Sequence, residues 1–341
     1  MTNILFSSAG RRVQLLRSFR RALSQRQEEG KILAADMEPT APALYEADKA
    51  FIVPPVVSSE YVTRLLDICR SELVRVVVPL IDPELPILAE HTAEFARIGT
   101  TVLVSSADSV RVADDKLATA AFFEACGVAY AKTCCASEAE AAIATGRIEF
   151  PLVVKPRRGS AGKGVRYCRT EHELRFCLDG WTDDEVVVQE YLEGCEVTID
   201  VFGDGTGRVI AAIPRKRIKV RGGEVERGVT IDDAQFRESV VAISSLFKPY
   251  GPINVQCFVT DRGPVFTEIN PRFGGGYPLA DAAGAQFPEM VLDLVSGRAI
   301  EPRLGSYERG LVMMRFDDAF YARETDLIVS SQAPRSSRCH P

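Results

Sequence analysis

Apolar residues along the first hundred positions fall into short runs separated by polar turns. These runs predict strands at 3–8, 31–35, 50–53, 74–80 and 100–104. Between several of them, apolar residues recur every three to four positions, which predicts helices at 60–72 and 84–97 and another that starts at Val13. Strands that alternate with helices form parallel sheets, so we expect an α/β sheet over roughly the first 105 residues.

The pattern changes in the second part of the chain, where strands follow one another more directly. A helical segment is predicted at 108–127 and a helix at 233–247, with strands at 151–155, 186–192 and 208–213. In the strand that starts at Glu196, apolar residues alternate with polar ones, which is typical of a strand with one buried face. The runs that contain Gln256 and Glu268 are separated by the turn 260–263, which predicts a hairpin.

Polar side chains interrupt the second strand of this hairpin where it ends. Glu268 and Asn270 are two positions apart, so a strand directs both to one face, and we expect the amide of Gln256 to point there from the partner strand. Carboxylate and amide oxygens suit Mg²⁺. Arg272 follows at once, and the glycines at 274–276 let the backbone approach a ligand closely. A metal site beside a guanidinium suits polyphosphate chemistry, and the alternative is a strand that ends in a polar turn.

A glycine-rich loop follows the strand that ends at Lys155. The loop contains the basic residues Arg157, Arg158 and Lys163 together with Gly159, Ser160, Gly162 and Gly164. Backbone N–H groups in such a loop bind phosphate and the lysine adds a cation, so we predict a flap over phosphate groups. The sequence of a Walker A loop is absent. The alternative is a hairpin turn in which the basic residues have no function.

Arginines elsewhere in the chain are weaker candidates for binding an anionic substrate. The densest basic run, 215–221, has five cations in seven residues and includes Arg217 and Arg221. We interpret the run as lining a substrate cleft, and the alternative is a solvated edge strand whose charges prevent aggregation. Arg11 follows the first strand, where a parallel sheet opens its crevice, and Arg315 is a further candidate. Any one of these arginines is also explained as a surface or structural residue.

Composition narrows the class of protein. The chain has 341 residues with 46% apolar and 26% charged residues and a net charge of −6, which is ordinary for a globular protein and shows no nucleic-acid footprint. No apolar run approaches the ~20 residues of a membrane span, and the N-terminus does not read as a signal peptide, so we expect a cytoplasmic protein without a membrane partner. With only three histidines and no CxxC among nine cysteines, any chemistry has to use carboxylates, amides, lysine and arginine.

Taken in order, these segments resemble the ATP-grasp superfamily, and in particular the synthetase domains of the carbamoyl phosphate synthase large chain and free-standing ligases of that type. The resemblance covers about residues 1–315. It is carried by Asp115-Lys116, Val153–Pro156 with the glycine flap, Gln189–Leu192, Asn254-Val255-Gln256 and Glu268-Ile269-Asn270-Pro271-Arg272. No single motif is specific, but the ordered set is.

The resemblance implies an architecture of α/β and α+β parts. A Rossmann-like domain would occupy residues 1–107, a small ATP-grasp lobe 108–188 and a large lobe with an antiparallel sheet 189–330. Residues 331–341 are expected to form a disordered tail, because their composition is polar and of low complexity.

The resemblance also implies roles for individual residues. Lys116 and Lys155 would hold the α- and β-phosphates of ATP under the flap, and Arg272 would face the γ-phosphate or an acyl phosphate. Glu190, Tyr191 and Leu192 would lie against the adenine and Glu196 against the ribose. Gln256, Glu268 and Asn270 would face Mg²⁺, with Lys155, Arg272 and Asn270 forming the catalytic set.

The function implied is that of an ATP- and Mg²⁺-dependent carboxylate–amine ligase that acts through an acyl phosphate and releases ADP and phosphate. We expect two Mg²⁺ ions, although Gln256 leaves the site with few negative charges, and we expect Mn²⁺ to substitute. The partners would be a small carboxylate and an amine, with a homodimer as the expected assembly. The alternatives are another enzyme on this scaffold, kinase-like or biotin-carboxylase-like, and a regulatory protein that binds nucleotide without turnover.

Overall fold

A computed structural model describes residues 2–159 and 164–328 of the chain, and these form two compact units. The N-terminal unit contains the chain up to Val104 together with Gln286–Ile300 and the segment from Phe316 onward. The second unit contains Ser105–Ala285 and Glu301–Arg315. The predicted flap residues Ser160 and Gly162 and the predicted tail at 331–341 lie outside the described residues.

The N-terminal unit is built on a five-stranded sheet with the order β3-β2-β1-β4-β5, in which every pairing is parallel. Its strands are β1 (Asn3–Ser7), β2 (Ile32–Asp36), β3 (Lys49–Ile52), β4 (Val74–Pro79) and β5 (Thr101–Val102). The helices between them are α1 (Val13–Gln25), α2 (Pro42–Glu46), α3 (Tyr61–Ser71) and α4 (Leu85–Arg97). The apolar runs become buried strands because a parallel sheet is covered on both faces, and the predicted α/β sheet is confirmed.

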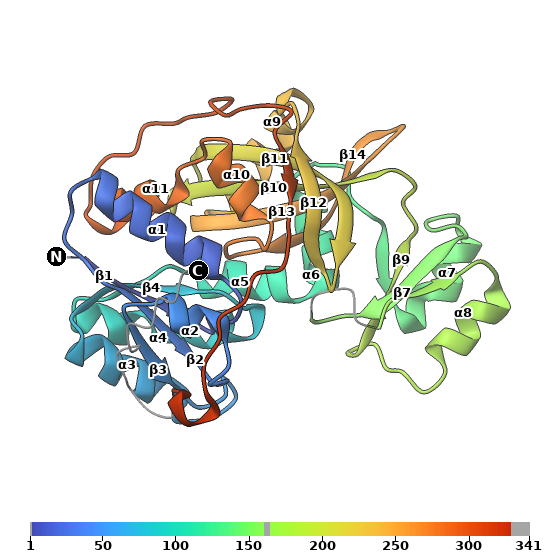
Figure 1. The fold of residues 1–341 in the computed structure, drawn as a ribbon. Coiled ribbons are helices and arrows are strands. Elements are labelled where there is room, and N and C mark those ends of the chain that lie inside the picture. The colour runs from blue at the N-terminus through green and yellow to red at the C-terminus, as the bar shows by residue number, and fades with distance from the viewer. Residues whose placement is uncertain (1, 160–163, 329–341) are drawn as a thin grey trace. The chain divides into compact units, whose positions relative to one another are not determined.

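One helix of this unit comes from far along the sequence. Helix α11 (Phe287–Val295) lies beside α1, as Figure 1 shows, and Arg26 donates a hydrogen bond to Asp293 across 2.7 Å. The sequence predicts residues 189–330 as one lobe, but the contacts place Gln286–Ile300 with the N-terminal unit. The apolar face of α11 is buried, and periodicity alone does not tell which sheet or helix covers such a face.

The second unit begins with two helices within the predicted helical segment. Helix α5 (Ala107–Asp114) ends before α6 (Lys116–Ala125) starts, and Asp115 between them has extended backbone angles. The Asp115 carboxylate accepts hydrogen bonds from the N–H groups of Leu117 and Ala118. The predicted helical segment at 108–127 is confirmed, and it is divided in two because Asp115 is an N-cap that starts a new helix.

A four-stranded antiparallel sheet with the order β6-β9-β7-β8 forms the small lobe of this unit. Its strands are β6 (Thr133–Cys135), β7 (Leu152–Pro156), β8 (Arg166–Cys168) and β9 (Val186–Glu190). Helices α7 (Ala139–Ala144) and α8 (Glu171–Leu178) lie on one side of it in Figure 1, and they share an apolar core with Leu152, Val154 and Val188. By alternation, Lys155 and Gln189 lie on the opposite face.

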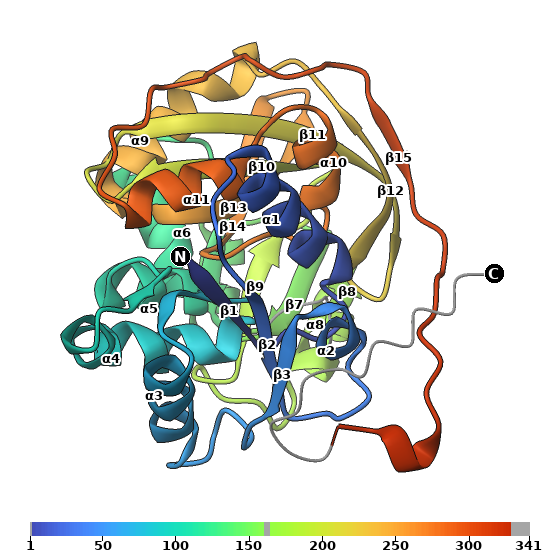
Figure 2. The same cartoon turned by 60° about the vertical axis from the view of Figure 1, so that its left-hand side comes forward.

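A six-stranded antiparallel sheet with the order β14-β13-β10-β11-β12-β15 forms the large lobe. Its strands are β10 (Cys195–Asp204), β11 (Val209–Arg221), β12 (Glu224–Thr230), β13 (Tyr250–Thr260), β14 (Gly263–Asn270) and β15 (Val312–Met314). Helix α9 (Arg237–Phe247) shares the apolar core of this sheet, and α10 (Tyr277–Ala282) follows β14. Figure 2 shows the long strands β10, β11 and β13, with β12 and β15 at one edge. The predicted hairpin of β13 and β14 is confirmed.

The basic run at 215–221 is paired along its length on one side and only at its start on the other. It forms the second half of β11, which pairs with β10 on one side and with β12 on the other. On the β10 side only Arg215 and Lys216 have partners, so residues 217–221 pair with β12 alone, and residues 218–221 are exposed. The alternative of a solvated edge strand therefore holds for most of the run.

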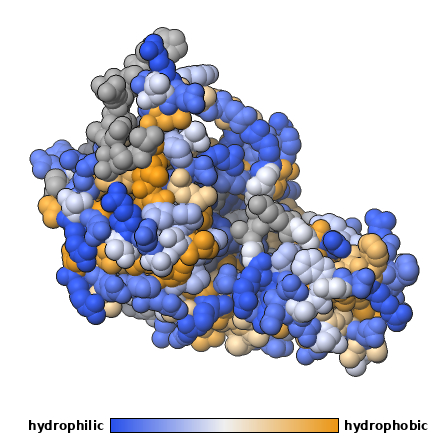
Figure 3. Space-filling model, turned by 90° about the horizontal axis from the view of Figure 1, so that it is seen from below, coloured by the Kyte–Doolittle hydropathy of each residue, from blue (hydrophilic) through white to orange (hydrophobic). Residues whose placement is uncertain are grey.

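The surface is mostly polar where Figure 3 shows it, with apolar side chains gathered in patches. Within residues 2–159 and 164–328, no helix is long and apolar enough to cross a membrane.

Candidate active site

The large sheet has one apolar face and one polar face. On β10, Val197, Ile199 and Val201 join the core under α9, so the alternating residues Glu196 and Asp200 point to the other side. The same alternation on β13 sends Val255 and Cys257 into the core and turns Asn254 and Gln256 away from it. The polar face is therefore built by the period of two that the sequence shows.

An irregularity in β14 decides which face its polar residues take. Gln256 is opposite Glu268, but the next residue, Cys257, is opposite Phe266, so Thr267 is an extra residue in the pairing. This β-bulge lets both Phe266 and Ile269 reach the core although they are three positions apart. Glu268 consequently points to the polar face, away from the core.

Register then aligns polar residues from four strands in rows. Arg215, Thr198, Gln256 and Glu268 occupy one row across β11, β10, β13 and β14. The adjacent row contains Asp200, Asn254 and Asn270. Gln256, Glu268 and Asn270 are thus brought together as predicted.

These three residues fit a hard divalent cation. They offer one carboxylate and two amide groups, which is an oxygen donor set that Mg²⁺ accepts, together with water or phosphate oxygens. Asn270 is 4% exposed, and its Nδ2 makes no hydrogen bond to any residue the structure describes. The side-chain amide is therefore not fully satisfied by the described residues around it. Within the described ranges there is no cluster of three or more His, Cys, Asp or Glu side chains suited to a metal, so the amides would have to complete the set.

Arg272 is held next to the end of β14 by local contacts. Its N–H donates to the carbonyl of Asn270 across 2.9 Å, and its guanidinium donates to the carbonyl of Phe273 and, at 3.4 Å, to the Asn270 side chain. These contacts orient the cation beside Asn270, as the sequence predicts.

Lys155 on β7 is the small-lobe residue that interacts electrostatically with this site. Its Nζ donates to Oε1 of Gln189 across 2.7 Å, and Gln189 in turn donates to Thr133. Burial lowers the pKa of Lys155 to about 8, while the charge of Glu268 acts to raise it and that of Lys116 to lower it. Lys155 therefore lies within electrostatic reach of both Glu268 and Lys116.

Lys116 stands at the start of α6 and contacts the beginning of the glycine loop. Its Nζ donates to the carbonyl of Gly159 across 2.7 Å, and its N–H donates to the carbonyl of Arg157. Gly159 and Gly164, which flank the undescribed part of the loop, both have positive φ values, 100° and 75°. The loop joins the antiparallel strands β7 and β8, so it is a hairpin connection, and its role as a flap stays a prediction.

The predicted adenine segment leaves β9 next to an apolar cluster of Leu192, Ala131, Val265 and Phe258. The Glu190 carboxylate is occupied by the N–H of Lys132 at 3.0 Å and by Arg262 at 3.3 Å. The N–H of Leu192 donates to no acceptor in the described part of the chain. Tyr191 is partly exposed and contacts Tyr167 edge to face.

Most of the remaining candidates lie in ion pairs. Glu196, predicted for ribose, is paired with Arg217, predicted for substrate. The pKa of Glu196 is raised by burial, opposed by the charge of Arg217 and reinforced by that of Glu268. Arg221 is 3.9 Å from Glu226, and Arg315 is 3.0 Å from Glu224. Arg11 belongs to the N-terminal unit.

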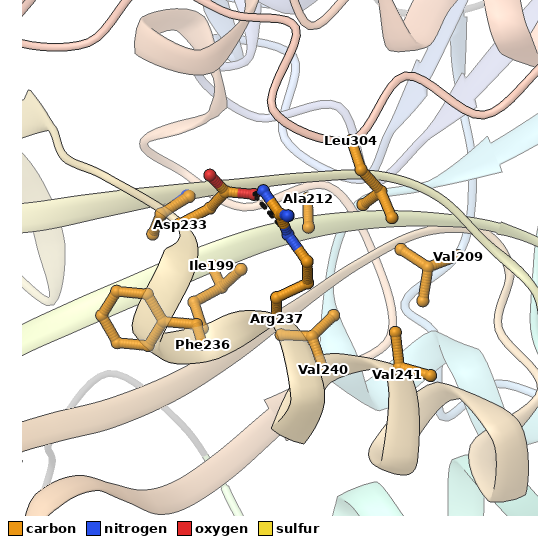
Figure 4. A pocket seen from close by; sticks show the side chains of 10 residues that line it. Ile199, Val209, Ala212, Asp233, Phe236, Arg237, Val240, Val241 and Leu304 are labelled. Atoms are coloured by element: carbon orange, nitrogen blue, oxygen red, sulfur yellow. Dashed lines mark hydrogen bonds and ion pairs between the residues drawn. The ribbon is translucent and has the colours of Figure 1, made fainter.

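A cavity lies on the other face of this sheet. An apolar space of about 250 Å³, partly open to solvent, is lined by β10, β11 and α9 residues such as Ile199, Val240 and Val241 (Figure 4). The ion pair of Asp233 with Arg237 lies at its rim. It belongs to the core side of the sheet and shares no lining residue with the polar rows.

Three family descriptions match successive parts of the chain. Residues 4–103 match the PylC-like N-terminal domain, residues 116–223 the D-ala D-ala ligase C-terminus, and residues 182–316 the ATP-grasp domain in the biosynthetic pathway with Ter operon. These matches confirm the predicted resemblance to the ATP-grasp superfamily.

Parts of the chain are similar to curated proteins. The carbamoyl phosphate synthase large chain of Gemmatimonas aurantiaca is 25% identical over 252 residues, which is 69% of this chain and 23% of that protein. The uncharacterized protein y4rH of Sinorhizobium fredii is 29% identical over 152 residues, which is 40% of this chain and 31% of that protein. The chain is thus similar to carbamoyl phosphate synthase and spans less than a third of the length of these two relatives.

Solved structures show the same fold at low identity. The biotin carboxylase domain of the Hydrogenobacter thermophilus 2-oxoglutarate carboxylase, solved with MgADP, ADP and bicarbonate, has a TM-score of 0.72 at 17% identity over 91% of this chain and 73% of that one. The N5-carboxyaminoimidazole synthetase of Staphylococcus aureus has a TM-score of 0.68 at 18% identity, over 88% and 78% of the two chains.

Proposed function

We propose that this protein is an ATP- and Mg²⁺-dependent carboxylate–amine ligase. The observation that carries the proposal is that Lys155, from the small lobe, lies within electrostatic reach of Glu268, which lies opposite Gln256 and two residues from Asn270 on the large lobe. Cations on one side and oxygen ligands on the other are what a metal-bound polyphosphate requires. The relatives that share this superfamily include synthetases and carboxylases, which supports the reaction class.

In the proposed reaction, a carboxylate oxygen attacks the γ-phosphorus of ATP and ADP leaves, which gives an acyl phosphate. An amine nitrogen then attacks the acyl carbon, phosphate leaves, and the nitrogen loses a proton to give an amide. Lys155 and Arg272 stabilise the negative charge that develops on the transferred phosphoryl group. Mg²⁺, held by Gln256, Glu268 and Asn270, would neutralise phosphate oxygens when bound. Positioning and charge supply most of the rate, so the scarcity of histidine is no obstacle.

The nucleotide would bind with its adenine against the apolar cluster at Leu192. The N–H of Leu192 and the main chain of Glu190 offer hydrogen bonds to the base edge, and Lys116, Lys155 and the loop at 159–164 offer contacts to the phosphates. Glu196 is proposed to accept a hydrogen bond from ribose while Arg217 compensates its charge.

A phosphate-release screen tests the proposal. Amino acids, other small carboxylates and bicarbonate are combined with amines in the presence of MgATP, and products are checked by mass spectrometry. Bicarbonate is included because a structure of the same fold was solved with it. ADP formation that requires both acid and amine, with an amide as product, supports a ligase. Phosphorylation without an amine indicates a kinase, and MgATP binding without any turnover across the panel contradicts the proposal.

Three finer features are proposed with this function. We expect two Mg²⁺ ions per site and substitution by Mn²⁺, which a titration with Mn²⁺ followed by electron paramagnetic resonance would count. We also expect a homodimer, which sedimentation equilibrium would detect, and a cytoplasmic location.

A further inference from the structure

A buried ion pair lies beneath the loop at 274–276, which follows Arg272. Arg215 on β11 and Asp200 on β10 are each 1% exposed. The guanidinium donates from Nε to Oδ2 across 2.5 Å and from Nη2 to Oδ1 across 3.0 Å. A buried ion pair contributes little net stability compared with apolar residues of the same size, so its presence here suggests another purpose.

The pair is connected to the candidate metal site through Asn254. Asn254 is the register partner of Asp200 on one side and of Asn270 on the other. Its Nδ2 donates to the carbonyl of Asn270 across 3.2 Å and to the carbonyl of Arg272 across 3.1 Å. One amide group therefore ties down both ends of the segment that carries Asn270 and Arg272.

The loop at 274–276 packs directly on the side chains of Asp200, Arg215 and Asn254. A methyl group at Gly274 would be 3.1 Å from Oδ1 of Asp200, 3.5 Å from Nη2 of Arg215 and 3.5 Å from Cγ of Asn254. A methyl group at Gly276 would be only 2.2 Å from Nη1 of Arg215. That Nη1 is buried and makes no hydrogen bond to any described residue, so the guanidinium serves as a surface on which the loop backbone packs.

We propose that Asp200, Arg215 and Asn254 are positioning residues that hold the segment from Asn270 to Arg272 in the geometry needed to bind the metal and the phosphates. This inference rests on the proposed function of the same site. The three residues act through Asn270 and Arg272 and make no bond to the reacting atoms. A rigid fork-to-carboxylate pair suits this task, because both partners have few alternative arrangements once buried.

The test measures how much Mg²⁺ strengthens ADP binding. Calorimetry gives the affinity for ADP with Mg²⁺ and with EDTA, in the wild type and in the double variant Asp200→Asn/Arg215→Met. The double change leaves no buried charge without its partner. We expect the gain from Mg²⁺ to fall about tenfold or more, because small misplacement of a site has effects up to about a hundredfold. Affinity in EDTA, which depends on the adenine segment, should stay within about twofold.

Two single variants refine the result. Asn254→Ala keeps the ion pair and removes the two hydrogen bonds to the segment, so it should show the same selective loss even if the double variant does not fold. Arg215→Lys keeps the positive charge but loses the bidentate guanidinium, so its gain in ADP affinity from Mg²⁺ should exceed that of the double variant and stay below that of the wild type. Arg237→Met is the matched control, because Arg237 pairs with Asp233 on the opposite face and Arg309 remains as a partner of Asp233.

The outcomes separate the inference from the proposed function. A full Mg²⁺ gain in both the double variant and Asn254→Ala overturns the inference. Equal losses with Mg²⁺ and with EDTA in Asn254→Ala also overturn it, since they would show a role in folding alone. A wild-type protein that binds ADP no better with Mg²⁺ than with EDTA overturns the proposed function, whatever the variants do.

Discussion

Replacing Lys155 by methionine should stabilise the fold while it removes nucleotide binding. The lysine is partly buried on β7, with its Nζ donating to Gln189 at 2.7 Å. Burial lowers its pKa from 10.5 to about 8, with Glu268 opposing and Lys116 adding to the change. A charged lysine in this place therefore destabilises the folded protein at neutral pH, and methionine has a similar length without the charge.

The size of the effect follows from the pKa. A fall in pKa from 10.5 to about 8 corresponds to about 3 kcal/mol of free energy of unfolding at pH 7. Gln189 would lose its donor, which costs about 1–2 kcal/mol. We therefore expect Lys155→Met to be more stable than the wild type by about 1–2 kcal/mol at pH 7.

The sign of the pH dependence is also determined. Between pH 8 and 10.5 the folded wild type binds fewer protons at this position than the unfolded chain, so its stability rises with pH across that window. The variant lacks this titration, so its advantage should shrink as the pH approaches 10.5. Comparing the free energies of unfolding of the two proteins at each pH removes the contribution of all other titrating groups, because these are the same in both.

Urea denaturation in metal-free buffer at pH 7, 8.5 and 10 measures these differences. Lys219→Met is the control, because Lys219 is exposed and pairs with Glu226 across 2.9 Å, so its loss should change stability by less than about 1 kcal/mol. The reasoning would be refuted by a Lys155→Met protein that is less stable than the wild type at pH 7, or whose advantage does not change with pH.

Three further substitutions test other parts of the site and its support. Glu268→Gln should reduce phosphate release at least about a hundredfold, because the only carboxylate in the proposed metal set loses its charge; a rate within a factor of two would exclude Glu268 from the site. Gly276→Ala should lower the free energy of unfolding by about 1–3 kcal/mol, since its methyl group would lie 2.2 Å from Arg215, and unchanged urea denaturation would contradict this packing. Asp115→Ala should cost about 2 kcal/mol in the same assay, because it removes both the cap of α6 and the ion pair with Arg157 at 2.7 Å.

Controls for these variants come from exposed positions. Glu193→Gln removes an exposed carboxylate that follows β9, so it should not alter phosphate release. Asp108→Ala removes an exposed ion pair with Arg111 near Asp115, so a loss of stability equal to that of Asp115→Ala would show that capping is not the cause.

Much of the fold and of the site could be predicted because it rests on local patterns. The parallel sheet of the N-terminal unit follows from buried apolar runs alternating with helices, and the polar face at Glu196 and Gln256 follows from strict alternation. The motif order from Lys116 to Arg272 indicates an ATP-grasp protein by resemblance, because the ordered set is specific although no single motif is.

Other features depend on contacts between distant segments, which a single sequence does not report. The chain shows Phe266 and Ile269 as apolar residues three positions apart, but only pairing with β13 shows that Thr267 is a bulge and that Glu268 faces the polar side. Arg215 is one cation in a basic run, and only the fold buries it against Asp200 beneath the loop at 274–276. Helix α11 joins α1 in the same way. Sequence thus determined the period of each element, whereas register, burial of charge and the choice of partner were decided by tertiary packing, because their energies arise between residues far apart in the chain.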